Sequence, residues 1–197
     1  DSIGLIAQHF EKNNECKEVT IMSADKDFYQ LISDKTSVYS PTKRKTYKVK
    51  DVLEEFEVHP NNYLLYKILL GDQSDNLPGV KGVGPKKAVK FFPLGDEQEH
   101  DIEELYSICE DNLGSNNVYG NVLEFKHQLN INYQLMNLRQ PNISAPDKQS
   151  IIESLNEDLT NLNIGAFMML YEADGLQNSI GNTHSWLAET FGSLILK

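Results

Sequence analysis

The stretch from Leu77 to Ala88, LPGVKGVGPKKA, constrains the fold of this chain more than any other part of it. Apolar residues at helical spacing precede and follow it, so its glycines and Pro85 predict a helix, a tight hairpin and a second helix. Two better-known glycine loops do not fit. A Walker phosphate loop needs a hydroxyl residue after its lysine, and a dinucleotide-binding loop needs a preceding strand.

The glycines and lysines of this stretch indicate contact with phosphates. Glycines let a backbone approach an anion closely, and the free N–H groups at the start of the second helix attract one. This arrangement is typical of a helix-hairpin-helix, which grips a nucleic-acid backbone without reading bases. A purely structural turn between two helices is the alternative. The residues expected to contact DNA are Gly79, Lys81, Gly82, Gly84, Lys86 and Lys87.

An acidic pair, Asp25 and Asp27, directly follows the apolar run 18–23, which predicts a buried strand. Open α/β sheets bind ligands beyond the carboxyl ends of their strands. The two carboxylates can therefore point into one crevice and share a divalent cation. In the structural alternative, Asp25 caps a short helix and Asp27 is an ordinary acid of its first turn.

A second acidic pair, Asp72 and Asp75, lies within the sequence GDQSDN at 71–76. A continued helical turn would set both carboxylates on one face, whereas the alternative is a loop after a helix. Magnesium takes only one or two carboxylates directly, and nuclease sites collect them from separate segments. We therefore expect Asp25, Asp27, Asp72 and Asp75 to act together in catalysis.

The remaining pattern predicts an α/β N-terminal part and a helical remainder. A helix should open the chain, and a short helix over 28–32 should join strands at 18–23 and 37–40 in a βαβ-like unit. Asp51 should cap a helix through Phe56, and Pro60 should open one through Leu70. Residues 43–50 alternate like an exposed hairpin arm. Further helices are expected over 85–91, 101–111, 117–138, 148–158, 161–172 and 183–191.

Charge is divided unevenly along the 197 residues. Residues 1–90 carry 14 basic and 13 acidic side chains, whereas residues 91–197 carry 4 and 16. This balance argues against a general polyanion binder and leaves only local basic patches. Cys16 and Cys109 have no ligand spacing and should be free thiols. Without a membrane-length apolar run or a secretory leader, we expect a soluble, cytoplasmic protein.

Together these motifs resemble the 5′-nuclease family: flap endonucleases and 5′–3′ exonucleases related to the N-terminal domain of bacterial DNA polymerase I. The resemblance is strongest to phage members, including the ribonuclease H-like ones, and extends over residues 1–92. The family motif S-x-D-x-D matches Ser23, Asp25 and Asp27, and G-D-x-x-D-N matches residues 71–76. The last carboxylate of the E-A-D-D motif falls on Asp1.

The resemblance implies a fold and a set of ions. Residues 1–58 would belong to a parallel-sheet, PIN-like nuclease core, 59–140 to a DNA-binding helix-three-turn-helix, and 141–197 to an all-helical C-terminal region. Two Mg²⁺ or Mn²⁺ ions are implied, with a K⁺ ion at the hairpin. Asp1, Asp25 and Asp27 would serve the first metal site, and Asp72 and Asp75 the second.

The implied activity is phosphodiester hydrolysis at a 5′ flap or 5′ end of DNA, or in an RNA–DNA hybrid, for primer or flap removal in replication. A single-strand binding protein and a sliding clamp are the implied protein partners, in the host cytoplasm if a phage encodes the chain. The family's N-terminal strands and helical arch have no counterpart here. We therefore expect the C-terminal portion of such a nuclease, with the downstream half of its active site.

Two other functions remain open from the sequence. A non-catalytic helix-hairpin-helix module would bind DNA with the same hairpin, but converging carboxylates near a phosphate would repel it. A nucleotidyltransferase with an accessory hairpin should carry its paired acids on adjacent strands. That pattern is absent from the sequence.

Overall fold

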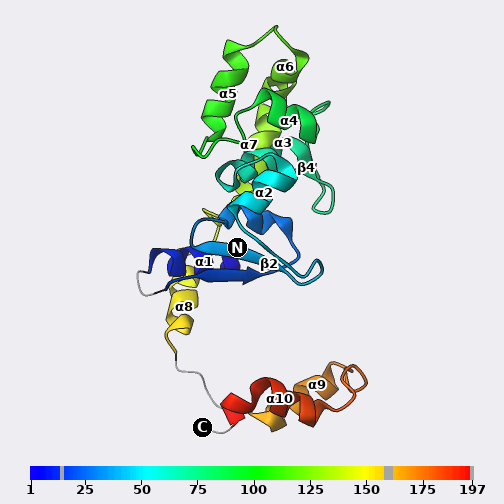
Figure 1. Ribbon diagram of the computed structural model, residues 1–197. Coiled ribbons are helices and arrows are strands. Elements are labelled where there is room, and N and C mark those ends of the chain that lie inside the picture. Colours follow the sequence, from blue (N-terminus) through cyan, green and yellow to red (C-terminus); the bar gives the residue numbers. More distant parts are fainter. Residues whose placement is uncertain (14–15, 158–161, 196–197) are drawn as a thin grey trace. The chain divides into compact units, whose positions relative to one another are not determined.

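A computed structural model describes residues 1–13, 16–157 and 162–195 (Figure 1). The chain forms two compact units, Asp1–Ile151 and Ile152–Lys197. The first unit contains every residue that the sequence assigns to a candidate site. The three-region division at residues 58 and 140 stays a prediction, since both boundaries lie inside this first unit.

A small sheet carries the N-terminal half of the first unit. Strand β1 (Val19–Met22) runs parallel to β2 (Thr36–Ser40), with Val19 opposite Thr36, and the 3₁₀ helix η1 (Lys26–Leu31) connects them. This is the expected βαβ-like unit. Strand β3 (Lys45–Tyr47) then pairs antiparallel with β2, so the three-stranded sheet is mixed. Helix α1 (Ser2–Lys12) packs against β1 and η1.

An aromatic core joins the sheet to the helices that follow it. The Tyr29 ring stacks on Tyr47 with centroids 4.7 Å apart, and both Phe56 and Tyr63 contact Tyr29 edge-on or tilted. These rings come from η1, β3, α2 (Val49–Phe56) and α3 (Tyr63–Leu70). Burial of large aromatic side chains is therefore what fixes the sheet against α3.

Helices make up most of the rest of the first unit. Helix α3 packs against two later helices, α4 (Pro85–Phe91) and α7 (Lys126–Met136). Helix α5 (Ile102–Asp111) has Asn112 as its C-cap residue, and helix α6 (Asn117–Glu124) has Phe125. The remaining elements are η2 (Pro60–Asn62), β4 (Gly71–Asp72), β5 (Leu77–Pro78) and α8 (Ala145–Leu155).

Three of the expected element boundaries are wrong. Lys48, not Asp51, is the N-cap of α2, and Asp51 instead accepts a hydrogen bond from the Lys48 N–H at 3.0 Å. Pro60 opens a short 3₁₀ turn, and α3 begins only at Tyr63. The single helix expected over 117–138 is two helices, because the backbone at Phe125 leaves helical geometry.

The second unit contains α9 (Ile164–Ala173) and α10 (Thr183–Ile195). Among its described residues, only Tyr171 and Leu187 are buried hydrophobic side chains. Met169 and Leu170 are mostly exposed. Within the described part of the chain, the helices are too short or too polar to cross a membrane.

Candidate metal centre and phosphate-binding hairpin

Three carboxylates from two distant segments converge in the first unit. Oxygen atoms of Asp27, Asp72 and Asp75 lie within 4.8 Å of one another. Asp27 follows β1 at its carboxyl end and belongs to η1, Asp72 ends β4, and Asp75 lies in the turn after it. The two acidic motifs, 45 residues apart in the sequence, are therefore brought together as predicted.

Asp25 and Asp1 lie outside this group of three. The Asp25 Oδ1 atom accepts a hydrogen bond from the Asp27 N–H at 2.9 Å, and the Ser23 Oγ atom accepts one from the Asp25 N–H at 3.1 Å. Asp25 is thus the N-cap of η1 and fixes the backbone at Asp27. Asp1 is the exposed N-cap residue of α1. Its metal-binding role stays a prediction.

The Asp72–Asp75 pair does not lie on a helical turn, so the alternative of a loop after a helix is the one that the structure has. Helix α3 ends at Leu70, and Gly71 takes a φ of +74°, which favours glycine. The chain then forms the two-residue ladder between β4 and β5. Asp72 Oδ1 accepts a hydrogen bond from the Ser74 N–H at 2.9 Å, which closes the turn that carries Asp75.

A lysine occupies the centre of the carboxylate group. Lys67 Nζ lies 2.7 Å from Asp27 Oδ1 and 2.7 Å from Asp72 Oδ2, and all three side chains are mostly buried. Burial opposes the charge of Lys67, but the contacts with both carboxylates outweigh it and raise the lysine pKa. Sequence analysis missed Lys67. A signal was present, because it is the one cation in the apolar helix YLLYKILL.

The two central carboxylates differ in their electrostatics. The Lys67 contact, assisted by Ser74, holds the pKa of Asp72 well below its ordinary value. Burial is the main influence on Asp27 and raises its pKa, and the charges of Asp25 and Asp72 act in the same direction. A further cation near Asp27 would favour its charged form and oppose the effect of burial.

The residues present fit a divalent metal ion. Asp27 Oδ1 is buried, and its one partner among the described residues is the Lys67 ammonium, 2.7 Å away. Three carboxylates against one ammonium leave an excess of negative charge. Carboxylate oxygens are the ligands that Mg²⁺ and Mn²⁺ prefer.

The glycine-rich segment forms the predicted hairpin between β5 and α4. Val80 and Val83 are buried and anchor it, with the Val83 N–H donating to the Val80 carbonyl at 3.0 Å. Gly82 has a φ of +78°. Lys87 Nζ donates to the Gly82 carbonyl at 2.8 Å, which leaves Lys81 and Lys86 as exposed cations without an ion pair among the described residues.

Two glycines of this segment meet different surroundings. A Cβ on Gly79 would lie 2.0 Å from the Leu70 carbonyl oxygen, so only glycine fits where β5 crosses the end of α3. A Cβ on Gly84 would meet no atom within 4 Å. Gly79 is thus required by the fold, whereas Gly84 leaves open space where the chain enters α4.

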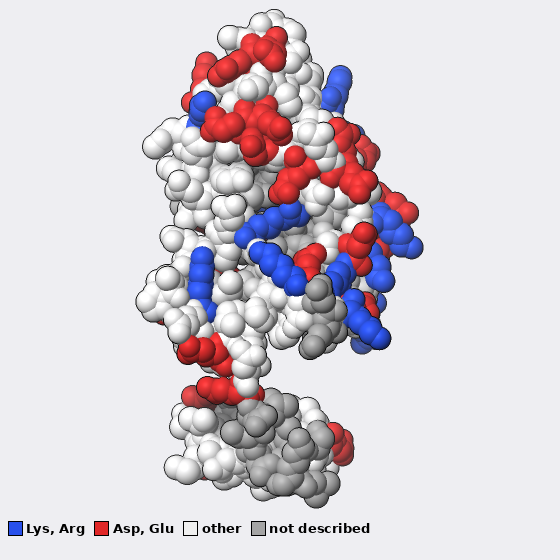
Figure 2. Space-filling model, turned by 90° about the vertical axis from the view of Figure 1, so that its left-hand side faces the viewer, with Lys and Arg blue, Asp and Glu red and all other residues white. Residues whose placement is uncertain are grey.

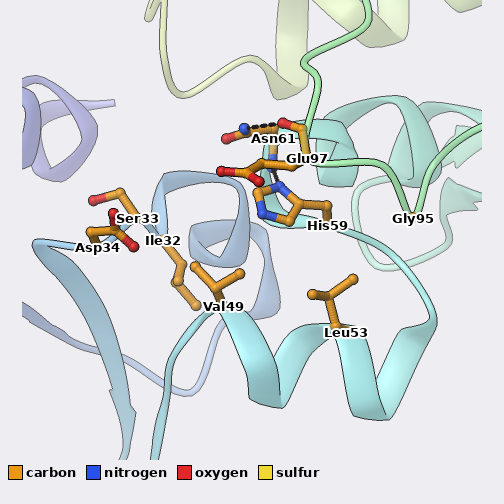
Figure 3. A pocket seen from close by; sticks show the side chains of 9 residues that line it. All are labelled: Ile32, Ser33, Asp34, Val49, Leu53, His59, Asn61, Gly95 and Glu97. Carbon is orange, nitrogen blue, oxygen red and sulfur yellow. Dashed lines mark hydrogen bonds between the residues drawn. The ribbon is translucent and has the colours of Figure 1, made fainter.

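A separate cavity of about 420 Å³ lies away from the carboxylates (Figure 3). His59 Nδ1 accepts a hydrogen bond from the Asn61 N–H, and burial lowers the His59 pKa, so this ring is neutral near pH 7. Asp34 and Glu97 on the rim are exposed. The cavity offers no group of metal ligands among the described residues. On the face drawn in Figure 2, acidic side chains predominate near the top of the view, and basic and acidic side chains lie among one another lower down on the right.

Comparison with known proteins identifies one matching family model. Residues 58–157 match the model described as 5′-3′ exonuclease, C-terminal SAM fold. This range covers the Asp72–Asp75 turn and the hairpin.

Several curated proteins are similar in sequence. DNA polymerase I of Thermus filiformis is 36% identical over 113 residues, which cover 57% of this chain and 13% of the polymerase. DNA polymerase I of Bacillus subtilis is 36% identical over 132 residues, or 65% and 14% of the two chains. The 5′-3′ exonuclease of Aquifex aeolicus is 37% identical over 92 residues, or 47% and 31%. This chain thus spans a minor part of each.

Solved structures share the fold. A mutant of the bacteriophage T5 5′-exonuclease superposes with a TM-score of 0.56 at 23% identity, covering 79% of this chain and 60% of that one. A T5 flap endonuclease complex with DNA and metal ions gives the same TM-score and identity, covering 79% and 54%. At this identity, the likeness establishes an α/β fold similar to that of the T5 exonuclease.

Proposed function

Because the chain belongs to the 5′-3′ exonuclease family, through the C-terminal SAM fold that residues 58–157 match, we propose that it is part of a metal-dependent, structure-specific 5′-nuclease. The single observation that carries this proposal is the convergence of Asp27 with Asp72 and Asp75. A module that only binds DNA has no use for three carboxylates at one point, because they repel phosphate.

Asp27, Asp72 and Asp75 would hold divalent ions. By family resemblance, Asp1, Asp25 and Asp27 are assigned to the first site and Asp72 and Asp75 to the second. An Mg²⁺ or Mn²⁺ ion held there would supply water activation for phosphodiester hydrolysis and charge neutralisation at the phosphate. Lys67 contacts Asp27 and Asp72 and favours the ionised form of these two carboxylates. Asp25 orients Asp27 through its backbone N–H.

The hairpin would bind the substrate duplex. Exposed Lys81 and Lys86 attract phosphates, and Gly82 and Gly84 allow the backbone to come close to them. Lys87 braces the turn through the Gly82 carbonyl, and Gly79 lets the hairpin cross α3. The DNA in the related T5 complex supports a DNA substrate. A K⁺ ion at the hairpin is part of the same proposal.

We also propose that the small sheet belongs to a larger PIN-like parallel sheet. The alternating ladder of β1 and β2 directs the Thr20 and Met22 N–H groups away from β2, toward an edge that no other described strand occupies. Met22 is 71% exposed there. Further strands, with further metal carboxylates, would come from the part of the nuclease that this chain does not contain.

The biological setting is proposed from family resemblance. The substrates would be 5′ flaps, 5′ ends and RNA–DNA hybrids, during primer or flap removal in replication. A single-strand binding protein and a sliding clamp would be partners. The competing function, a non-catalytic DNA-binding module, makes the same hairpin contacts without metal-dependent cleavage.

Cleavage and metal binding test the proposal together. A 5′-flap duplex and an RNA–DNA hybrid are incubated with this chain in Mg²⁺ or in EDTA, and Mn²⁺ binding is titrated in parallel. We expect Mn²⁺ binding that is lost in Asp72→Asn and retained in Asp111→Asn, an exposed matched control. Any cleavage should require both Mg²⁺ and an intact Asp72. DNA binding without Mn²⁺ binding would favour the non-catalytic module.

A further inference from the structure

Two buried side-chain amides connect both halves of the carboxylate group to one helix, α7. Gln30 is 1% exposed and Asn132 is 0% exposed. Neither was singled out in the sequence, where an isolated glutamine or asparagine carries no pattern. Both make hydrogen bonds to backbone groups far away in the chain, which buried amides require.

Gln30 ties the Asp27 half to the end of α7. Its Nε2 atom donates to the Asp27 carbonyl at 2.9 Å and to the Met136 carbonyl at 3.0 Å. Its Oε1 atom accepts from the Leu138 N–H at 2.9 Å. The Gln30 backbone carbonyl in turn accepts two hydrogen bonds from Arg139, at 2.9 and 2.8 Å. Through Gln30, the backbone at Asp27 is thus held to residues 136–139.

Asn132 ties the other half to the middle of the same helix. Its Nδ2 atom donates to the Pro78 carbonyl at 2.9 Å and lies 3.4 Å from the Ile68 carbonyl. Pro78 pairs with Gly71 in the ladder that frames Asp72 and Asp75. Helix α7 also packs along α3, which supplies Lys67 (Figure 1).

We propose that α7 sets the separation between the two carboxylate segments, and that Gln30 and Asn132 are the positioning residues through which it does so. The two segments lie 45 residues apart in sequence, Asp27 in the 3₁₀ helix η1 and Asp72 in β4, and no strand pairing connects them. Lys67 attracts both carboxylates, but an ammonium contact imposes little direction. The amides supply directed hydrogen bonds to fixed backbone groups. This proposal rests on the proposed metal site.

Mn²⁺ affinity, measured by isothermal titration on the whole chain, tests the proposal. Gln30→Met keeps the side-chain length and removes the hydrogen bonds, so Asp27 loses its fixed place. We expect Mn²⁺ binding about tenfold weaker or more, the range typical when a group that orients a metal ligand is removed. Asn132→Leu should weaken binding similarly, because it frees the Asp72 segment.

Asn62→Leu is the matched control. Asn62 is also fully buried and donates to the carbonyls of Asp96 and Gln98, but among the described residues its side chain makes no hydrogen bond to either carboxylate segment. It should lose thermal stability as the other variants do while keeping Mn²⁺ affinity within about twofold of wild type. That difference separates positioning from a general loss of stability.

Arg139→Gln provides a second variant in case Gln30→Met does not fold. Arg139 is partly exposed and holds the Gln30 carbonyl from outside the core. We expect a smaller loss of Mn²⁺ affinity with a native circular dichroism spectrum. Unchanged affinity in folded Gln30→Met, or in Arg139→Gln if the first variant is unfolded, would overturn the positioning role. Absence of Mn²⁺ binding by the wild type would overturn the metal site itself.

Discussion

At the scale of single residues, Asp27 and Asp72 both contact Lys67, yet their ionised forms affect the stability of the folded state in opposite directions. The pKa of Asp72 is lowered, mainly by Lys67, so its contact stabilises the folded state above the ordinary carboxyl pKa. The pKa of Asp27 is raised, mainly by burial, so its ionisation costs stability at neutral pH. A metal ion would remove that cost.

We predict that Asp72→Asn lowers the melting temperature of the metal-free chain at pH 7. The difference from wild type should begin to shrink as the pH falls below about 3.8, because Asp72 then takes up a proton in the unfolded chain while the folded carboxylate stays ionised. Melting curves at pH 7, 5 and 3 in EDTA measure this. A difference that stays constant down to pH 3 would contradict the assignment.

Asp27→Asn should behave in the opposite sense. Without metal at pH 7 we expect a melting temperature equal to or above that of wild type, because an amide is easier to bury than a carboxylate. The advantage should vanish at pH 3, where wild-type Asp27 is protonated. Adding Mn²⁺ should raise the melting temperature of wild type only. A clear loss of stability at pH 7 would show that the Lys67 contact outweighs burial.

Lys67→Met should make the chain more dependent on metal. Removing the ammonium leaves two mostly buried carboxylates facing each other, at a cost of about 2 kcal/mol, below the ~3–5 kcal/mol typical of fully buried pairs. Differential scanning calorimetry with and without Mn²⁺ should show a larger metal-induced shift than in wild type. Lys50→Met, which alters an exposed lysine, should show the wild-type shift.

Spacing in the sequence was sufficient to find Asp25, Asp27, Asp72 and Asp75. It could not rank them. Whether a carboxylate faces a metal or caps a helix depends on backbone geometry, and Asp25 does cap η1. The contacts of Lys67 and Gln30 could not be predicted from the sequence, because their partners lie on other elements and no local pattern reveals them.

At the scale of elements, the hairpin was predictable because glycine and proline act locally. The strands of the βαβ-like unit were predictable for a related reason, the short apolar run before Asp25. The helix expected over 117–138 was not, because Phe125 breaks it without a glycine or proline. At Asp72 the sequence left a helical turn and a loop open, because the geometry there depends on the pairing of β4 with β5.

Gly84→Ala separates DNA contact from folding. The φ of Gly84 is −112° and its surroundings are open, so alanine should leave the melting temperature unchanged. Should a phosphate approach this backbone, the added methyl group would obstruct it and weaken duplex binding about tenfold, by ~1.4 kcal/mol. Fluorescence anisotropy at two salt concentrations measures the loss. Equal affinity for both proteins would place the DNA elsewhere.

Gly79→Ala is the contrasting variant at the same element. Its Cβ would collide with the Leu70 carbonyl, so we expect loss of thermal stability before any effect specific to DNA.

At the scale of the whole molecule, the two units carry unequal parts of the structure. The hydrophobic core lies in the first unit, and the described residues of the second bury little. The sequence indicated this only as an acidic helical remainder. Periodicity located α9 and α10 approximately, but it does not reveal how much apolar surface a helix will bury.

A chain that ends at residue 157 should therefore keep the melting temperature and Mn²⁺ affinity of the full chain. Ending the chain at residue 124 should abolish both, because α7 contributes the buried residues Leu129, Asn132 and Met136. Thermal melting and Mn²⁺ titration of the three lengths make the comparison. A large loss on truncation at residue 157 would mean that the second unit supports the first.

The ladder between β4 and β5 has a consequence for sequence length. Gly71 and Gly79 lie at the two ends of the turn that carries Asp72 and Asp75, and they hold it close to the end of α3. The hairpin begins directly after Gly79. Substitutions at exposed positions in this loop leave that frame intact. A single residue inserted or deleted between Gly71 and Gly79 would displace the carboxylates and the hairpin together. Across related proteins, we therefore expect the exposed, non-acidic positions of this segment to vary in composition while the length of the segment stays constant.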